Sequence, residues 1–282
     1  MQSTPCHIHI SSKHSFFKLN LKEVWEYRDL IMLFTKRNFA VRYKQTILGP
    51  AWLFINPIIS SLIYTFIFGR IAGIGTDGVP QLLFYMTGNA IWNYFSSCLT
   101  RNAHTFTSNA GVFGKVYFPR LTTPISNMFT SAIEFGIQMI LAMVFLLYYM
   151  YFGAVHPNWL AWLAVPAVLI HLGVMGLGFG IIISSLTTKY RDLSILVGFG
   201  VSLWMYITPV VYPLSQAGDS IYKTWLLINP VTAPIELFRY AILGQGSIVP
   251  WALIWSAVFT LVVAVFGIMV FNKVERTFMD TV

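Results

Sequence analysis

One apolar run of this chain reads WLAWLAVPAVLIHLGVMGLGFGIIISSL, from Trp159 to Leu186, and it contains no Asp, Glu, Lys or Arg. A helix of about 20 apolar residues is long enough to cross the hydrocarbon core of a bilayer. The whole chain has 282 residues, of which 56% are hydrophobic and 10% are charged, whereas an ordinary soluble domain is about 25% charged. The composition therefore excludes a soluble globular enzyme and predicts one all-α polytopic membrane domain.

Five further runs have the length of a membrane span, so six transmembrane helices are predicted. They are expected at residues 51–69, 82–99, 124–150, 159–186, 193–212 and 250–272. Only the third contains a charged residue, Glu134, and a charge at a span centre costs about 2.5 to 3.5 kcal/mol. We therefore expect Glu134, with Gln138 one helical turn later, to form a polar contact between helices or to line a substrate path.

The basic residues gather on one side of these six spans. Fifteen of the 18 Lys and Arg residues fall in the first 50 residues, the second loop, the fourth loop and the tail. They are Lys13, Lys18, Lys22, Arg28, Lys36, Arg37, Arg42, Lys44, Arg101, Lys115, Arg120, Lys189, Arg191, Lys273 and Arg276. Arg70, Lys223 and Arg239 fall on the other side. Because Lys and Arg favour cytoplasmic loops, both termini are predicted to be cytoplasmic. In a soluble protein a net charge of +8 would suggest a nucleic-acid partner, but here the positive residues follow the membrane topology, and no nucleic-acid partner is expected.

The segments outside the spans divide the chain further. Residues 1–20 form a predicted flexible lead with no assigned function, residues 21–50 an amphipathic cytoplasmic interface segment, and residues 51–282 the six-helix domain. Within residues 21–50, helical spacing puts one set of apolar residues on a single arc, namely Leu21, Val24, Trp25, Ile31 and Met32. Such a helix lies along a membrane surface, either as a simple anchor or as a docking platform for a cytosolic partner.

Two loops are longer or more apolar than a simple connection requires. Residues 100–123 leave room for a short helix that projects from the membrane and contacts a partner. The external segment between the fifth and sixth spans is too apolar for a solvated loop, and Asn229-Pro230 divides it into two pieces. Short apolar helices of this kind are expected to dip back into the outer half of the membrane, where their backbone breaks must face protein or water. The mouth of a pore provides such surroundings, so we expect these two helices there.

Glycines and aromatic residues within the spans have two interpretations each. Gly173, Gly176, Gly178 and Gly180 predict either close helix packing or a bend in the fourth span. Aromatic rings pack on the C–H faces of sugars, and they equally fill cores or face lipid. The candidates for an aromatic channel lining are Tyr64, Phe66, Phe199, Trp204 and Tyr206.

Motifs for chemistry are missing from the sequence. It has no G-x-x-x-x-G-K-[ST] phosphate loop, no H-E-x-x-H motif and no nucleophile elbow. We therefore expect no catalytic residue, no metal site and no cofactor, and we expect a separate subunit to hydrolyse ATP if the transport is ATP-driven. A gradient-driven carrier is disfavoured because few ionisable residues lie in the spans, and a membrane glycosyltransferase because no acid and base pair is present.

Five stretches together resemble the membrane subunits of ABC type-2 transporters that export polysaccharides, which are the O-antigen, capsule and teichoic acid permeases. The stretches are RYKQTILGPAW at 42–52, KVYFPR at 115–120, YRDL at 190–193, TPVVYP at 208–213, and NPVT at 229–232 followed by IELFR at 235–239. The resemblance covers the chain from about residue 20 to its end. It implies a homodimer that sits on two copies of an ABC ATPase, with a channel lined by the first and fifth spans.

The same resemblance implies roles for individual segments. Contact with the ATPase falls on residues 21–45 and 101–114, with Trp25, Arg101, Asn102, His104, Thr107 and Asn109 as candidates. The external gate falls on the two re-entrant helices at about 214–242, with Pro209, Tyr212, Asn229, Pro230, Glu236 and Arg239 as candidates. The protein is then expected in the bacterial cytoplasmic (inner) membrane, as a multi-pass permease.

The function predicted on this basis is export of a lipid-linked polysaccharide, with O-antigen for lipopolysaccharide biosynthesis first. The alternatives are a teichoic acid or capsule exporter and a drug or lipid efflux permease of the same superfamily. The partners are the ATPase, a second copy of the chain, membrane lipids and an undecaprenyl-diphosphate-linked glycan. Lys36, Arg37, Arg42 and Lys44 lie just before the first span and are candidates to bind the phosphates of that anchor, although topology alone also predicts basic residues there.

Overall fold

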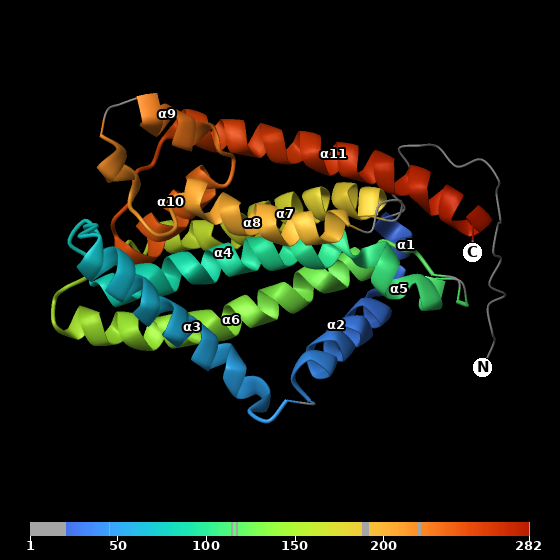
Figure 1. The fold of residues 1–282 in the computed structure, drawn as a ribbon, viewed down its shortest axis with the longest axis horizontal. Coiled ribbons are helices and arrows are strands. Elements are labelled where there is room, and N and C mark those ends of the chain that lie inside the picture. Colours follow the sequence, from blue (N-terminus) through green and yellow to red (C-terminus); the bar gives the residue numbers. More distant parts are fainter. Residues whose placement is uncertain are drawn as a thin grey trace.

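A computed structural model of the chain describes residues 21–44, 46–113, 115–116, 118–187, 192–218 and 221–281. Within these ranges every regular element is a helix (Figure 1), which confirms the predicted all-α class. The predicted N-terminal lead at 1–20 lies outside the described residues, as do Gln45, Tyr117, Lys189, Tyr190 and Arg191.

The elements follow one another along the chain without a strand between them in the described part. They are α1 (Leu21–Glu26), α2 (Arg28–Tyr43), η1 (Gly49–Ala51), α3 (Trp52–Tyr64), η2 (Thr65–Ile71), α4 (Gln81–Ala103), α5 (Thr105–Phe113), α6 (Thr122–Tyr151), η3 (Ala161–Ala164), α7 (Val165–Thr187), α8 (Leu193–Ile207), η4 (Leu214–Ala217), α9 (Ile221–Ile228), α10 (Thr232–Leu243) and α11 (Pro250–Thr281). Proline at the first helical position starts α11, where its missing N–H has no helical partner to lose.

Four helical stretches are long and apolar enough to cross a membrane by themselves. They are Gly49–Ile71, Thr122–Tyr151, Ala161–Thr187 and Pro250–Lys273, and they coincide with the first, third, fourth and sixth predicted spans. The bent pair of α9 and α10 raises the number of candidates to five if it is counted as one span. The structure therefore supports a polytopic membrane protein with four to five candidate spans.

The two other predicted spans correspond to α4 and α8. Helix α4 has 23 residues but is less apolar, because it includes Asn89, Asn93 and Arg101. Helix α8 has 15 residues and ends at Ile207, five residues before the predicted end of the span. The chain turns extended at Thr208 because the following Pro209 disfavours helical backbone in the residue before it.

Helix α4 forms the centre of the bundle and packs against α6 and α7, and α7 packs in turn against α11. The glycines of α7 allow both of these close approaches. A Cβ atom built on Gly180 would lie 2.7 Å from the backbone oxygen of Leu99 on α4, and one built on Gly178 would lie 3.0 Å from Val263 on α11. Since α7 runs unbroken through these glycines, close packing is the interpretation that the structure supports.

The N-terminal segment is helical, as predicted, and only part of its predicted apolar arc is buried within the chain. Val24 and Ile31 are buried, whereas Trp25 and Met32 are exposed. Helix α2 packs on α6, and Phe34 joins the buried side through an edge contact with Phe118. Ile31 and Phe34 therefore face the bundle, whereas Trp25 of α1 and Met32 of α2 remain accessible.

The bundle has two distinct ends (Figure 1). Helices α1 and α5 and the C-terminal end of α11 lie at one end, which we call the α5 end. The connections between η2 and α4 and between α6 and η3, with α9 and α10, lie at the opposite end, the α9 end. Helices α9 and α10 meet at an angle of 94°, and Asn229-Pro230 stands at the break as predicted.

Candidate functional site: a polar cavity between α2, α4, α5 and α6

Toward the α5 end, four helices surround a polar cavity of about 570 Å³. Helix α2 contributes three basic or amide side chains, and the end of α4, the start of α6 and one face of α5 close the other sides. The lining residues are Arg37, Asn38, Val41, Arg42, Arg101, His104, Ser108, Asn109, Val112, Thr123, Ser126 and Asn127. Three arginines and a histidine in one cavity make it suited to an anion.

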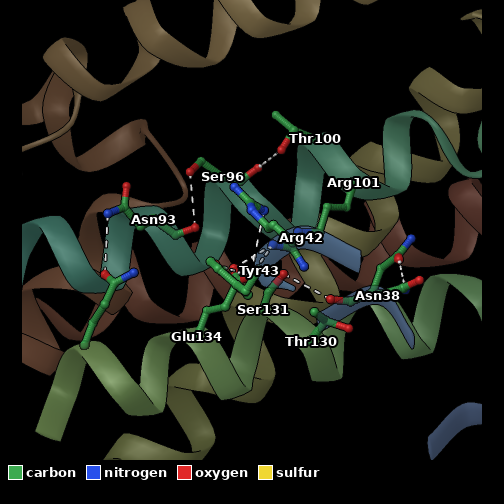
Figure 2. Close-up of polar contacts among 12 residues, drawn as sticks. Asn38, Arg42, Tyr43, Asn93, Ser96, Thr100, Arg101, Thr130, Ser131 and Glu134 are labelled. Carbon is green, nitrogen blue, oxygen red and sulfur yellow. Dashed lines mark hydrogen bonds and ion pairs between the residues drawn. The ribbon is translucent and has the colours of Figure 1, made fainter. Parts of the chain in front are cut away.

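Beside this cavity, Glu134 of α6 collects donors from two other helices (Figure 2). Nη2 of Arg101 donates to both carboxylate oxygens, at 2.7 and 2.6 Å. The hydroxyl of Tyr43 donates to Oε1 at 3.0 Å, and Nη1 of Arg42 lies 3.8 Å from the same oxygen. The side chain of Glu134 is 8% exposed. Glu134 therefore forms the predicted polar contact between helices, joining α6 to α4 and α2.

Gln138 makes a second and weaker contact of the same kind, because its Oε1 accepts from Nδ2 of Asn93 on α4 at 3.5 Å. Burial and the nearby carboxylate of Glu134 raise the pKa of Tyr43 to about 12. The phenol thus stays protonated at any physiological pH and can act only as a donor to Glu134.

A chain of hydrogen bonds connects Arg37 with the asparagine side chains in and beside the cavity. Nη2 of Arg37 donates to the side-chain oxygens of Asn38 at 3.1 Å and of Asn109 on α5 at 3.4 Å. Nδ2 of Asn38 donates to Asn127 on α6 at 3.2 Å, and Asn127 donates to Asn102 on α4 at 3.1 Å. One network therefore ties all four helices together.

The structure separates the four predicted phosphate-binding residues into two pairs. Arg37 and Arg42 line the cavity, whereas Lys36 and Lys44 are exposed and do not line it. Asn38, Tyr43 and Asn127 take part in the network and were not predicted. The lone carboxylate of Glu134 was a signal for a donor such as Tyr43, although it does not say from which helix the donor comes, whereas no signal in the sequence pointed to the contact between Asn38 and Asn127.

The predicted ATPase-contact residues also fall into two groups. Trp25 is 69% exposed and Thr107 is exposed on α5, so both are accessible to a partner. Arg101, His104 and Asn109 line the cavity, and Asn102 is fully buried. In this conformation Trp25 and Thr107 can therefore contact a partner directly, whereas Asn102 cannot.

The five residues predicted as an aromatic channel lining differ in exposure. The ring of Tyr64 packs against Phe68 and Tyr85, and the ring of Trp204 packs edge-on against Phe95 and Phe179. The three others are exposed on the outer surface of the bundle, and they are Phe66, Phe199 and Tyr206.

The predicted gate residues form a second polar cluster at the α9 end. Arg239 and Glu236 of α10 pair at 2.6 Å and are both buried. Arg239 also donates to the backbone oxygens of Pro209 at 2.9 Å and Val210 at 3.1 Å, and its guanidinium lies 4.1 Å from the ring centre of Phe84. This arginine thus fixes α10 to the segment after α8 and to α4.

The break between α9 and α10 is held by a neighbouring set of contacts. Asn229 accepts from Nε1 of Trp204 at 3.1 Å and donates to the hydroxyl of Thr208 at 2.9 Å. The carbonyl of Pro230 accepts from Ser256 on α11, and the hydroxyl of Tyr212 donates to the carbonyl of Tyr206 at 3.3 Å. Among the described residues, no group of three His, Cys, Asp or Glu side chains is placed to hold a metal ion.

Known proteins resemble this chain over nearly its whole length. The O-antigen export system permease protein RfbA of Klebsiella pneumoniae is 29% identical over 258 residues, which are 89% of this chain and 94% of that protein. RfbA of Myxococcus xanthus is 28% identical over 78% of this chain and 82% of its own length. The polysialic acid transport protein KpsM of Escherichia coli is 22% identical over 87% and 93%. The family model described as ABC-2 type transporter matches residues 29–243, and the chain therefore belongs to the ABC-2 type transporter membrane family.

Proposed function

We propose that this chain is the permease subunit of an ATP-driven exporter that moves a lipid-linked polysaccharide, in the first place O-antigen, across the bacterial inner membrane. The observation that carries the proposal is the similarity, over 78 to 89% of the chain, to proteins named as O-antigen export permeases, at 28 to 29% identity. The sequence agrees with this proposal, because it contains no phosphate loop, and the exporter would need a separate ATPase, in two copies for a homodimer.

A capsule polysaccharide is the second candidate substrate. It is favoured by the similarity to KpsM and to the capsule polysaccharide export protein CtrC of Neisseria meningitidis serogroup B, which is 20% identical over 88% of this chain. The lower identity of these relatives places capsule after O-antigen.

In the proposed topology six segments cross the membrane once each. They are the continuous stretch from η1 through α3 to η2, and then α4, α6, α7, α8 and α11. Helices α9 and α10 enter and leave the membrane on the same side. The common position of α1, α5 and the end of α11 supports it (Figure 1), because chain ends on one side require an even number of crossings. Lys and Arg dominate the segments assigned to that side, which makes it the cytoplasmic one. The α9 end would then hold the external gate.

The channel is proposed at the interface of two copies, between the first and fifth spans. The exposed positions of Phe66 on η2 and of Phe199 and Tyr206 on α8 support this, because rings on the outer surface of one chain can line a passage only when a second chain closes it. Tyr64 and Trp204 would support these helices from the core.

Co-purification tests the proposal. The tagged chain is isolated from its own bacterium in mild detergent, and the proteins and lipids recovered with it are identified by mass spectrometry. We expect an ATPase with a phosphate loop in a one-to-one ratio with the chain, and a lipid-linked glycan. Recovery of the chain alone, as a monomer, would contradict the proposal.

Variants at the two ends of the bundle make the test specific. Trp25→Arg on α1 and Thr107→Arg on α5 introduce a bulky charge at exposed positions of the α5 end, and we expect them to reduce ATPase recovery at least fivefold. Ala154→Arg introduces the same charge at an exposed position of the α9 end and is expected to leave the recovery unchanged. Equal effects of all three variants would argue against ATPase contact at α1 and α5.

A further inference from the structure

We infer that the cavity between α2, α4, α5 and α6 binds the diphosphate group of the lipid-linked glycan, and that Arg37, Arg42 and Arg101 are the residues that contact it. The inference rests on the proposed function and deepens it, because it assigns the anchor to a built cavity instead of to the basic segment as a whole. Lys36 and Lys44 then have no part in binding, although they carry the same charge as Arg37 and Arg42 and lie in the same segment.

The formal charge of the cavity balances the charge of such a ligand. Three arginines line it, and Glu134 neutralises one of these charges, which leaves a formal charge of +2 when His104 is neutral. A diphosphate esterified at both ends carries two negative charges at neutral pH, whereas a glycerophospholipid headgroup such as phosphatidylglycerol carries one. The charge balance therefore favours the diphosphate over ordinary lipid.

The donors in the cavity are of the kind that binds phosphate oxygens. An arginine guanidinium offers several N–H groups in one plane and can bind two phosphate oxygens at once. Both described side-chain hydrogen bonds of Arg101 use Nη2 and go to Glu134, so the rest of its guanidinium is left for a ligand in the cavity that it lines. Glu134 thereby acts as a positioning residue, since it fixes the orientation of Arg101 without facing the cavity itself.

Size and access fit the same ligand. The volume of about 570 Å³ lies within the range of roughly 300 to 1,000 Å³ that small-molecule sites occupy. The side chain of Arg42 is 57% exposed and that of Arg101 is 16% exposed, so the cavity has an open rim and a more enclosed wall. A headgroup can enter from the rim while its lipid tail stays outside.

The position of the cavity connects the ligand to the segments expected to contact the ATPase. Arg37 belongs to α2 and is bonded to Asn109 of α5, and both line the cavity. A ligand held by Arg37 and Arg101 would therefore restrain α2, α4 and α5 relative to one another. We expect occupancy to change the rate of ATP hydrolysis by the bound ATPase, and we expect Arg37→Gln to lose that response.

The test uses the complete complex of permease and ATPase in lipid nanodiscs. The probe is a polyprenyl diphosphate that carries one sugar, and its binding is measured by native mass spectrometry and by stimulation of ATP hydrolysis. Arg37→Gln, Arg42→Gln and Arg101→Gln are each expected to weaken probe binding about tenfold, which corresponds to the loss of one charged hydrogen bond. Lys36→Gln and Lys44→Gln remove the same charge from the same segment and are expected to change binding less than twofold.

The choice of variants also distinguishes a loss of binding from a folding defect. Arg101→Gln leaves Glu134 without its main partner, so the double variant Arg101→Gln/Glu134→Gln is made as well, and it is expected to fold and still to bind the probe weakly. Arg37 and Arg42 are exposed enough for their single variants to assemble normally.

The outcomes separate the inference from the proposed function. Equal losses for the lysine and arginine variants would overturn the cavity in favour of general attraction by a basic surface. Equal competition by phosphatidylglycerol or by inorganic phosphate would overturn the assignment to a diphosphate. A complex that assembles and exports glycan while all three arginine variants bind the probe normally would remove this inference alone, whereas absence of an ATPase partner would remove the proposed function.

Discussion

Glu134 illustrates how a single charged residue is tolerated inside an apolar helix. A carboxylate removed from water is stabilised only when donors surround it, and here Arg101 and Tyr43 both donate to it. Both side chains of the ion pair are mostly buried, at 8% and 16% exposure, so solvent screens the pair little. Each member therefore depends on the other.

The first prediction concerns this pair. Arg101→Ala and Glu134→Ala are each expected to destabilise the protein by about 3 to 5 kcal/mol, because each leaves a buried charge without its partner. The double variant is expected to lose much less than the sum, since no unpaired charge remains. Thermal unfolding of the purified protein in detergent measures the stability of each variant, and Lys36→Ala at an exposed position is the control. Strictly additive losses would show that the two residues do not stabilise each other.

The sequence was enough to identify Glu134 as a residue that needs polar partners, because it is the only charge in the predicted spans. Its main partner was not predictable, since Arg101 lies 33 residues away on another helix. The family resemblance assigned Arg101 to ATPase contact, and the structure places its side chain at the cavity, where it bonds Glu134. Hydropathy and charge patterns describe one helix at a time and say nothing about which side chains meet between helices.

At the scale of elements, the glycines of α7 determine how close the central helices come. Gly176 and Gly180 face α4, and Gly178 faces α11, so one helix approaches two neighbours closely on two of its sides. In a membrane, where lipid competes with protein for apolar contacts, such small residues allow the backbone packing that holds helices together.

The second prediction tests this contact. Gly180→Ala would put a Cβ atom against Cβ of Asn102 and 2.7 Å from the backbone oxygen of Leu99, so α4 and α7 must separate. We expect a loss of about 1 to 3 kcal/mol, as for other overpacked positions, seen as a lower unfolding temperature in detergent. Gly136→Ala on α6 is the matched control, because nothing lies within 4 Å of its Cβ position, and it should be neutral or stabilising by up to about 1 kcal/mol.

Element boundaries followed from the sequence only where a backbone rule applied. Asn229-Pro230 predicted the break between α9 and α10, and that break is present. The end of the fifth predicted span at 212 was placed too late, because hydropathy continues through Val210 and Val211 while the helix already ends at Ile207 before Pro209. Hydropathy reports where apolar residues lie, and proline decides where the helix stops.

For the molecule as a whole, the bent pair of α9 and α10 decides the number of crossings. The two helices have 8 and 12 residues, so they are about 12 and 18 Å long at roughly 1.5 Å per residue. Because the chain bends by 94° between them, they reach only about 21 Å from end to end, compared with a hydrocarbon core of roughly 30 Å. Helix α8, which the proposed topology counts as a span, is about as short with its 15 residues, so it is the sharp bend between α9 and α10 that favours the proposed re-entrant pair.

The last prediction follows from this geometry and is measured by cysteine labelling. In a background with Cys6→Ser and Cys98→Ala, single cysteines replace three exposed residues, Thr107 on α5, Tyr222 on α9 and Ile248 after α10. A membrane-impermeant maleimide is expected to label Tyr222→Cys and Ile248→Cys in spheroplasts and Thr107→Cys only in inside-out vesicles, whereas all three react in detergent. If Tyr222→Cys and Ile248→Cys reacted from opposite sides, the pair would be a true span. An odd number of crossings would then put the end of α11 across the membrane from α5, which contradicts their common position at one end of the bundle (Figure 1).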